Sequence, residues 1–194
     1  MKFLSDGRLP PGRHAVSGPG DLCGRFLTAL CPALLRGARV LWLDGGNSFN
    51  AYGAGYASRA LGAGARDALS RVELARPFNL HQLETMVKVK VPERWRGEPV
   101  IVADPLPLFY DPDVPAAAAR RVWERVQEGM DALPAAWVVL LPERRAPDDR
   151  LGWDENFIRL ADGFTRFHGT NASDDRADAP GRGRGLEAFP PGSP

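Results

Sequence analysis

Three short apolar runs without polar interruptions constrain the fold of this chain more than any other feature of its sequence. They cover residues 40–43, 99–103 and 136–141, and the first two are each followed by an aspartate, Asp44 and Asp104. Strands that read as continuous apolar runs are typical of a parallel sheet whose two faces are both covered by helices. The chain is therefore predicted to adopt an α/β fold.

Helical patterns alternate with these strands along the chain. Such alternation implies right-handed crossovers and a mostly parallel, twisted sheet with helices on both faces. From the spacing of the apolar residues we expect helices at 25–36, 52–61, 80–89 and 116–133, further strands at 14–17 and 72–75, and a terminal antiparallel strand pair at 157–160 and 163–167.

The length and the composition together predict one domain followed by a tail. A chain of 194 residues is long enough to bury one sizeable core, and we expect it to form one domain and not two. We assign residues 1–168 to the core. Residues 169–194 contain five Gly and four Pro and very few apolar side chains, so this segment is predicted to be a disordered tail.

Charge and hydropathy exclude two classes of partner. The 25 Lys and Arg residues nearly balance the 24 Asp and Glu residues, so the overall positive field of a general polyanion-binding protein is absent. No apolar run reaches the ~18 to 20 residues that a membrane helix needs, and residues 1–13 lack the apolar stretch of a signal peptide. We predict a cytoplasmic protein that does not contact a membrane.

The two cysteines do not indicate a disulfide or a metal site. Cys23 and Cys31 lie eight positions apart in one predicted helix, which separates them too far for a disulfide. Neither has a Cys or His neighbour at the spacing of metal ligands, so no metal site is predicted.

The carboxyl ends of the predicted strands are the place where ligands bind in sheets of this type. A glycine-rich loop at 18–24 follows the first strand, and Asp44 and Asp104 end two others, so these three segments are expected to converge. The loop has two interpretations: its backbone amides hold an anion, or it is a plain turn between a strand and a helix.

Four segments, in this order along residues 10–167, resemble the RecA/RadA family of recombinases, and most closely its short RadB-type members. Residues 43–49 (LDGGNSF) and 75–82 (ARPFNLHQ) carry the strongest similarity. Residues 100–104 are similar to the family's Walker B strand, and residues 161–167 to its last core strand.

The resemblance implies a RecA-like P-loop NTPase core with a degenerate Walker A loop at 18–26. Asp104 would be the Walker B aspartate. The nucleotide-binding positions implied by the resemblance are Gly18, Gly20, Gly24 and Arg25, with Asp44 at the end of the second strand.

The departures from the family fall on its chemistry. Arg25 stands where a P-loop has Lys, and Phe26 stands where it has the Ser or Thr that holds magnesium. Gly46 aligns with the glutamate that activates the attacking water, and Pro142 with a residue that senses the γ-phosphate. We therefore predict that no catalytic residue remains and that no cofactor is needed. The alternative is that ATP and magnesium are still bound.

Two functions of different class follow from this comparison. The first is a pseudo-ATPase that acts as an accessory or regulatory protein in DNA recombination or repair, through a protein partner such as a RecA-family protein or a polymerase. The alternative is a divergent DNA-dependent ATPase, a RadB/RadA-like paralogue that binds ATP at the 18–26 loop.

A mixed-charge loop at 143–150 lies where family members place DNA-binding loops. The candidate DNA contacts in it are Arg144, Arg145 and Arg150, but three acidic residues in the same loop offset them. Only weak DNA binding is therefore expected.

Overall fold

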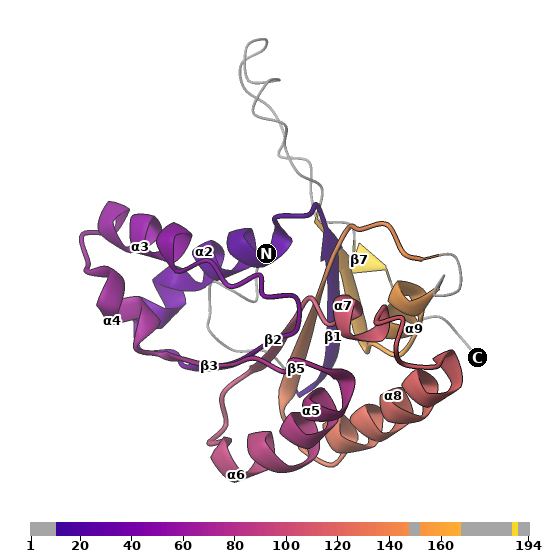
Figure 1. Cartoon of the computed structure of the whole chain (residues 1–194). Coiled ribbons are helices and arrows are strands. Elements are labelled where there is room, and N and C mark those ends of the chain that lie inside the picture. The colour runs from indigo at the N-terminus through magenta and orange to yellow at the C-terminus, as the bar shows by residue number, and fades with distance from the viewer. Residues whose placement is uncertain (1–10, 148–151, 168–187, 190–194) are drawn as a thin grey trace.

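The computed structural model describes residues 11–147, 152–167 and 188–189, which form one seven-stranded sheet with helices on both faces (Figure 1). The strand order is β3-β2-β4-β5-β1-β6-β7. The first six strands pair in parallel, and only β7 is antiparallel, to β6. The predicted α/β fold with a mostly parallel sheet is confirmed. The strands are β1 (Gly12–Gly18), β2 (Val40–Asp44), β3 (Val72–Ala75), β4 (Val100–Ala103), β5 (Ala136–Pro142), β6 (Gly163–Arg166) and β7 (Ala188–Phe189).

The helices form two layers, one on each face of the sheet (Figure 1). One layer consists of α2 (Leu22–Leu35), α3 (Ala51–Ala60) and α4 (Ala65–Leu69). The other contains α5 (Leu80–Thr85), the π-helical turn η1 (Met86–Lys90), α6 (Val91–Arg94), α7 (Leu106–Phe109), α8 (Ala116–Asp131) and α9 (Trp153–Arg159). None of the described helices is long and apolar enough to cross a membrane.

The sheet has one hydrophobic cluster on each face. Each central strand contributes side chains to both clusters, because successive side chains of a strand point to opposite faces of the sheet. Trp42 of β2 packs in the cluster under α2, with Phe26 at a ring-centroid distance of 6.4 Å. Its neighbour Leu41 packs in the opposite cluster, together with Phe109 and Trp123. This double burial explains why the strands read as uninterrupted apolar runs.

The terminal antiparallel pair expected at 157–160 and 163–167 is wrong. Residues 157–159 lie in α9, and β6 pairs in parallel with β1. A helix is favoured because it places Trp153 and Phe157, four residues apart, on one face. Both rings pack on Phe109, at centroid distances of 4.7 and 5.4 Å.

The segment predicted as a tail contains one described element. Ala188 and Phe189 form β7, opposite Thr165 and Phe164 of β6. The other residues after 167 lie outside the described part of the chain. A two-residue strand has no sequence pattern of its own, so only the pairing with β6 reveals it.

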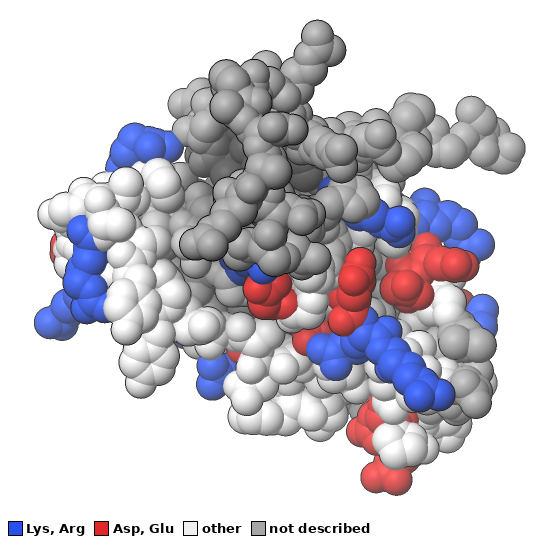
Figure 2. All heavy atoms as spheres, turned by 90° about the horizontal axis from the view of Figure 1, so that it is seen from above, with Lys and Arg blue, Asp and Glu red and all other residues white. Residues whose placement is uncertain are grey.

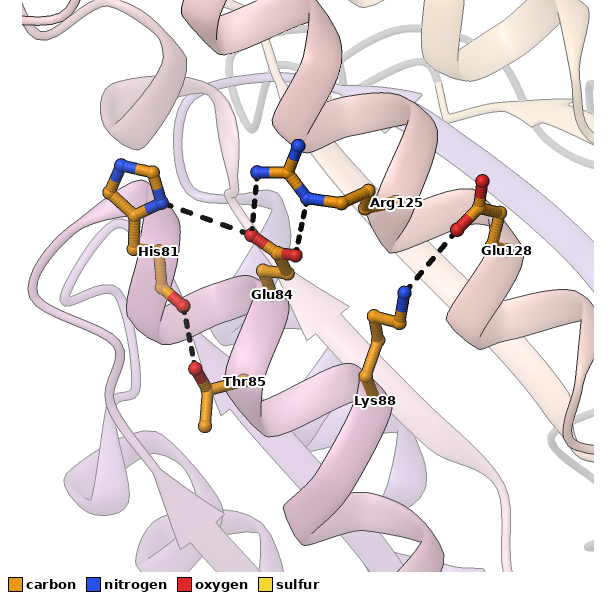
Figure 3. Close-up of polar contacts among 6 residues, drawn as sticks. All are labelled: His81, Glu84, Thr85, Lys88, Arg125 and Glu128. Atoms are coloured by element: carbon orange, nitrogen blue, oxygen red, sulfur yellow. Dashed lines mark hydrogen bonds and ion pairs between the residues drawn. The ribbon is translucent and has the colours of Figure 1, made fainter.

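The predicted helix at 80–89 is α5 followed by η1, and charged side chains tie both to α8 (Figure 3). Glu84 accepts two hydrogen bonds from Arg125, at 2.5 Å from Nε and 3.0 Å from Nη2. One turn further on, Lys88 pairs with Glu128 at 3.3 Å. These contacts fix the register of the two segments across the face of the sheet.

We expect Glu84→Gln to lower the melting temperature at neutral pH, because the side chain of Glu84 is only 19% exposed and its bond to Arg125 is bidentate. The hydrogen bonds from Arg125 lower the pKa of Glu84 below its ordinary value. A lowered carboxyl pKa stabilises the folded state above the unfolded pKa, and this stabilisation disappears as the pH falls through the folded pKa. The melting temperatures of the wild type and Glu84→Gln should therefore converge in acid.

Glu128→Gln is the matched control and should change the melting temperature little, since the Glu128 side chain is 67% exposed. Equal effects of the two substitutions would contradict this account.

Candidate functional site at the carboxyl ends of the central strands

The fold brings the predicted site segments to one edge of the sheet. β2 and β4 are neighbours, with Asp44 opposite Ala103, so Asp44 at the end of β2 lies beside Asp104, which directly follows β4. The chain leaves β2 toward α3 on one face of the sheet and leaves β4 toward α7 on the other. Such a switch point opens a crevice in which ligands bind in α/β proteins.

Asp44 holds the loop that follows its own strand. Its carboxylate accepts hydrogen bonds from the backbone N–H of Ser48 (2.7 Å), the Ser48 hydroxyl (3.0 Å) and the backbone N–H of Phe49 (3.2 Å). It also accepts one from Nε of Arg76 at 3.1 Å, and it is almost completely buried. With four donors around it, this carboxylate positions the 45–50 loop and the start of α3.

Asp104 is buried, 2% exposed, and its backbone has a φ of 49°. Aspartate tolerates this left-handed conformation better than most residues. One carboxylate oxygen, Oδ2, accepts a hydrogen bond from Nη2 of Arg144, and the other, Oδ1, has no partner among the described residues. Burial raises the pKa of Asp104, and the nearby Asp44 adds to this, while Arg144 opposes it.

Gly46 leaves the space into which the Asp104 side chain extends. A Cβ at position 46 would lie 2.0 Å from Oδ2 and 2.4 Å from Cγ of Asp104. Gly45 has a similar constraint, since its Cβ would lie 2.9 Å from the backbone oxygen of Asp104. The resemblance assigns a glutamate to position 46 in the family; here the carboxylate of Asp104 occupies that volume.

The glycine-rich segment is shorter as a loop than its sequence indicates. β1 ends at Gly18 and α2 begins at Leu22, so only three residues connect them. The turn is closed by a hydrogen bond from Leu22 N–H to the Pro19 oxygen at 2.8 Å. Gly24 lies inside the helix, where an added Cβ would have 3.9 Å to its nearest neighbour, Asn50.

The two side chains that follow Gly24, those of Arg25 and Phe26, contact other residues of the protein. Nε of Arg25 donates to Asp21 at 2.7 Å, and the guanidinium lies 5.9 Å from the Phe167 ring centroid. Phe26 is 2% exposed and belongs to the core. Of the other glycines, Gly18 packs tightly against Phe167, whereas Gly20 is exposed.

Cys23 lies beside this site but is buried. Burial raises the pKa of its thiol to about 12, so it stays protonated and unreactive at neutral pH. Within the described residues no group of three or more His, Cys, Asp and Glu side chains is arranged to hold a metal ion.

An open cleft of about 620 Å³ lies beside Asp44 and the glycines that follow it, and Asp104 does not line it. The loops after β2, β3 and β4 form its walls, and its lining includes Asp44, Arg76, Phe78 and Tyr110. Phe78 is 82% exposed, and burial raises the pKa of the Tyr110 hydroxyl. Sequence reasoning missed Arg76, Phe78 and Tyr110, since nothing in the local pattern shows that these loops meet.

The three candidate DNA contacts do not share one role. Arg144 turns inward to Asp104, Arg145 is exposed, and Arg150 lies outside the described residues. Pro142, the predicted position of a phosphate sensor, ends β5 opposite Gly18 and is buried. Figure 2 shows acidic and basic side chains interspersed over the right-hand part of the face seen from above.

Comparison with known proteins does not assign this site. No family model matches the chain, and a search of the curated proteins finds no match.

Proposed function

We propose that this chain is a RecA-like domain that acts through protein contacts, as an accessory or regulatory factor in DNA recombination or repair, and not through ATP hydrolysis. The observation that carries the proposal is the ion pair of Asp104 with Arg144, in which the Asp104 carboxylate fills the space left by the missing side chain of Gly46. A Walker B aspartate needs its carboxylate free for hydrated magnesium, whereas this carboxylate is buried and bound to an arginine of the same chain.

Two further features support this proposal. The turn at 19–21 has too few residues to wrap around a triphosphate, and Arg25 and Phe26 are engaged with Asp21 and with the core. The parallel sheet and the convergence of Asp44 and Asp104 at one edge agree with the order of the segments that resemble the recombinases.

A calorimetric titration with ATP and with ADP, with and without magnesium, tests the absence of nucleotide chemistry. We expect no saturable binding and no hydrolysis above background, because the Asp104 carboxylate is buried against Arg144 and the side chains of Arg25 and Phe26 are held by Asp21 and by the core. The matched variant is Arg25→Glu, which reverses an exposed charge in the first turn of α2. Magnesium-dependent binding that Arg25→Glu weakens would instead favour the divergent ATPase.

The role in recombination or repair is tested with a purified RecA-type recombinase on single-stranded DNA. The protein is expected to change the rate of ATP hydrolysis by the recombinase, or the rate of lesion bypass by a repair polymerase, at stoichiometric amounts. If both rates stay unchanged while the protein is folded, the proposed role is wrong.

A further inference from the structure

The outer face of α3 carries two exposed tyrosines where a surface helix ordinarily carries charged side chains. Tyr52 and Tyr56 are 82% and 69% exposed, and their spacing of four residues places them on the same face. The guanidinium of Arg59 lies 4.9 Å from the Tyr56 ring centroid, so it extends this face. No Asp or Glu occurs in α3.

This helix is held firmly in the fold. Asn50 caps it by accepting hydrogen bonds from the N–H groups of Tyr52 (3.0 Å) and Gly53 (3.2 Å). On the inner face Ala54, Gly55 and Ser58 are buried. The tyrosines are therefore presented on a rigid element, which lowers the entropy lost when they are covered.

The layer that contains α3 is basic, although the whole chain is nearly neutral. Residues 21–71 contain six Arg and three Asp, and two of these Asp, Asp21 and Asp44, form ion pairs. Three exposed arginines of this layer, Arg39, Arg59 and Arg66, have no carboxylate partner among the described residues.

The rest of the described core is close to neutral. Residues 11–20, 72–147 and 152–167 contain fourteen Asp and Glu against thirteen Lys and Arg. In Figure 2 most of the acidic side chains lie away from the left-hand part of the view, where α3 is found in Figure 1. The electrostatic complement of the α3 face is therefore a negatively charged partner.

From this arrangement we infer that the face of Tyr52, Tyr56 and Arg59 docks an acidic segment of a partner protein, with an apolar anchor flanked by Asp or Glu side chains. Tyrosine and arginine, together with tryptophan, are enriched at the energetic centre of protein interfaces. A nucleic acid fits less well, because one arginine on the helix face makes no basic stripe. The inference rests on the proposed function, since it names the kind of partner.

Fluorescence anisotropy with a labelled acidic peptide tests the inference. The probe is a twelve-residue peptide of Asp and Glu around a central Leu-Phe pair, and the references are its Lys-substituted analogue and labelled oligo(dT). We expect saturable binding of the acidic peptide at low salt, weaker binding at about 0.3 M salt, and no binding of the basic analogue.

The variants locate the binding surface. Tyr52→Ser/Tyr56→Ser and Arg59→Glu should each weaken binding of the acidic peptide about tenfold or more. The matched controls Val89→Ser and Arg121→Glu change exposed side chains of the opposite layer and should leave binding unchanged. All of these residues are exposed, and circular dichroism shows whether each variant is folded.

Three results would overturn the inference: no binding of the acidic peptide, binding that the tyrosine variant leaves intact, or tighter binding of oligo(dT) than of the peptide. None of them involves ATP. Failure here is therefore distinguishable from failure of the proposed function, which the nucleotide titration and the recombinase assay decide.

Discussion

Replacement of Arg144 by alanine is expected to lower the free energy of unfolding by about 3 kcal/mol at pH 7. Asp104 is 2% exposed and has Arg144 as its ion-pair partner, so the substitution leaves a buried carboxylate without a counter-charge. The expected loss lies at the low end of the usual range for buried pairs because the Arg144 side chain is 35% exposed. Urea unfolding of the wild type and the variant measures the difference.

Two measurements test whether the unpaired Asp104 carboxylate, and not lost packing of the Arg144 side chain, causes the loss of stability. They are the pH dependence of the loss and the effect of a second substitution. The pKa of Asp104 is already raised by burial, and removal of Arg144 raises it further. A carboxyl with a raised folded pKa destabilises the fold as the pH rises through that pKa, so the deficit of Arg144→Ala should shrink in acid. Arg144→Ala combined with Asp104→Asn should be more stable at pH 7 than Arg144→Ala alone. Wild-type stability of Arg144→Ala would show that the ion pair contributes nothing.

Replacement of Gly46 by alanine is expected to cost about 3 kcal/mol of stability or more. The new Cβ would lie 2.0 Å from Oδ2 of Asp104, the atom that binds Arg144. The carboxylate must move to relieve the overlap, and its ion pair is then broken. Gly46→Glu, which introduces the residue that the resemblance assigns to this position, should be still less stable and should not hydrolyse ATP.

Gly24→Ala is the matched control for Gly46→Ala. Gly24 lies inside α2, and an added Cβ would make only an ordinary van der Waals contact, 3.9 Å from Cβ of Asn50, so the substitution should stabilise the protein, by up to about 1 kcal/mol, through helix propensity. If Gly24→Ala is strongly destabilising or Gly46→Ala is neutral, the arrangement of this site is wrong. Because Gly46 and Arg144 both act on Asp104, the double variant should lose less than the sum of the two single losses.

The predictions for Arg144→Ala and Gly46→Ala both concern the carboxylate of Asp104, which is central to the proposed function. If Asp104 and Arg144 form a stabilising pair, the aspartate that the resemblance would assign to magnesium binding is part of the folded framework. Among the described residues, the face of Tyr52, Tyr56 and Arg59 and the cleft beside Phe78 stay exposed.

The strands of the core were predictable because their signal is local. The predicted strand at 72–75 matches β3, and the runs at 40–43 and 136–141 differ from β2 and β5 by one residue at the end. Helix α9 was missed because its seven residues are too few for a clear helical period. Trp153 and Phe157 lie on one helix face because both pack on Phe109, which lies more than forty residues away in the sequence, and no local pattern reveals that contact.

What the sequence determined by itself is the layered α/β fold and the convergence of Asp44, Asp104 and the glycine-rich segment at one edge. Both follow from periodicity and from the fact that parallel strands end at the same side of a sheet. What only the tertiary structure decided is the state of these groups: Asp44 is bound to Arg76 and Asp104 to Arg144, 32 and 40 residues further along the chain. Ion pairs over such separations depend on how the loops are placed by the packed helices, and no local pattern encodes that placement.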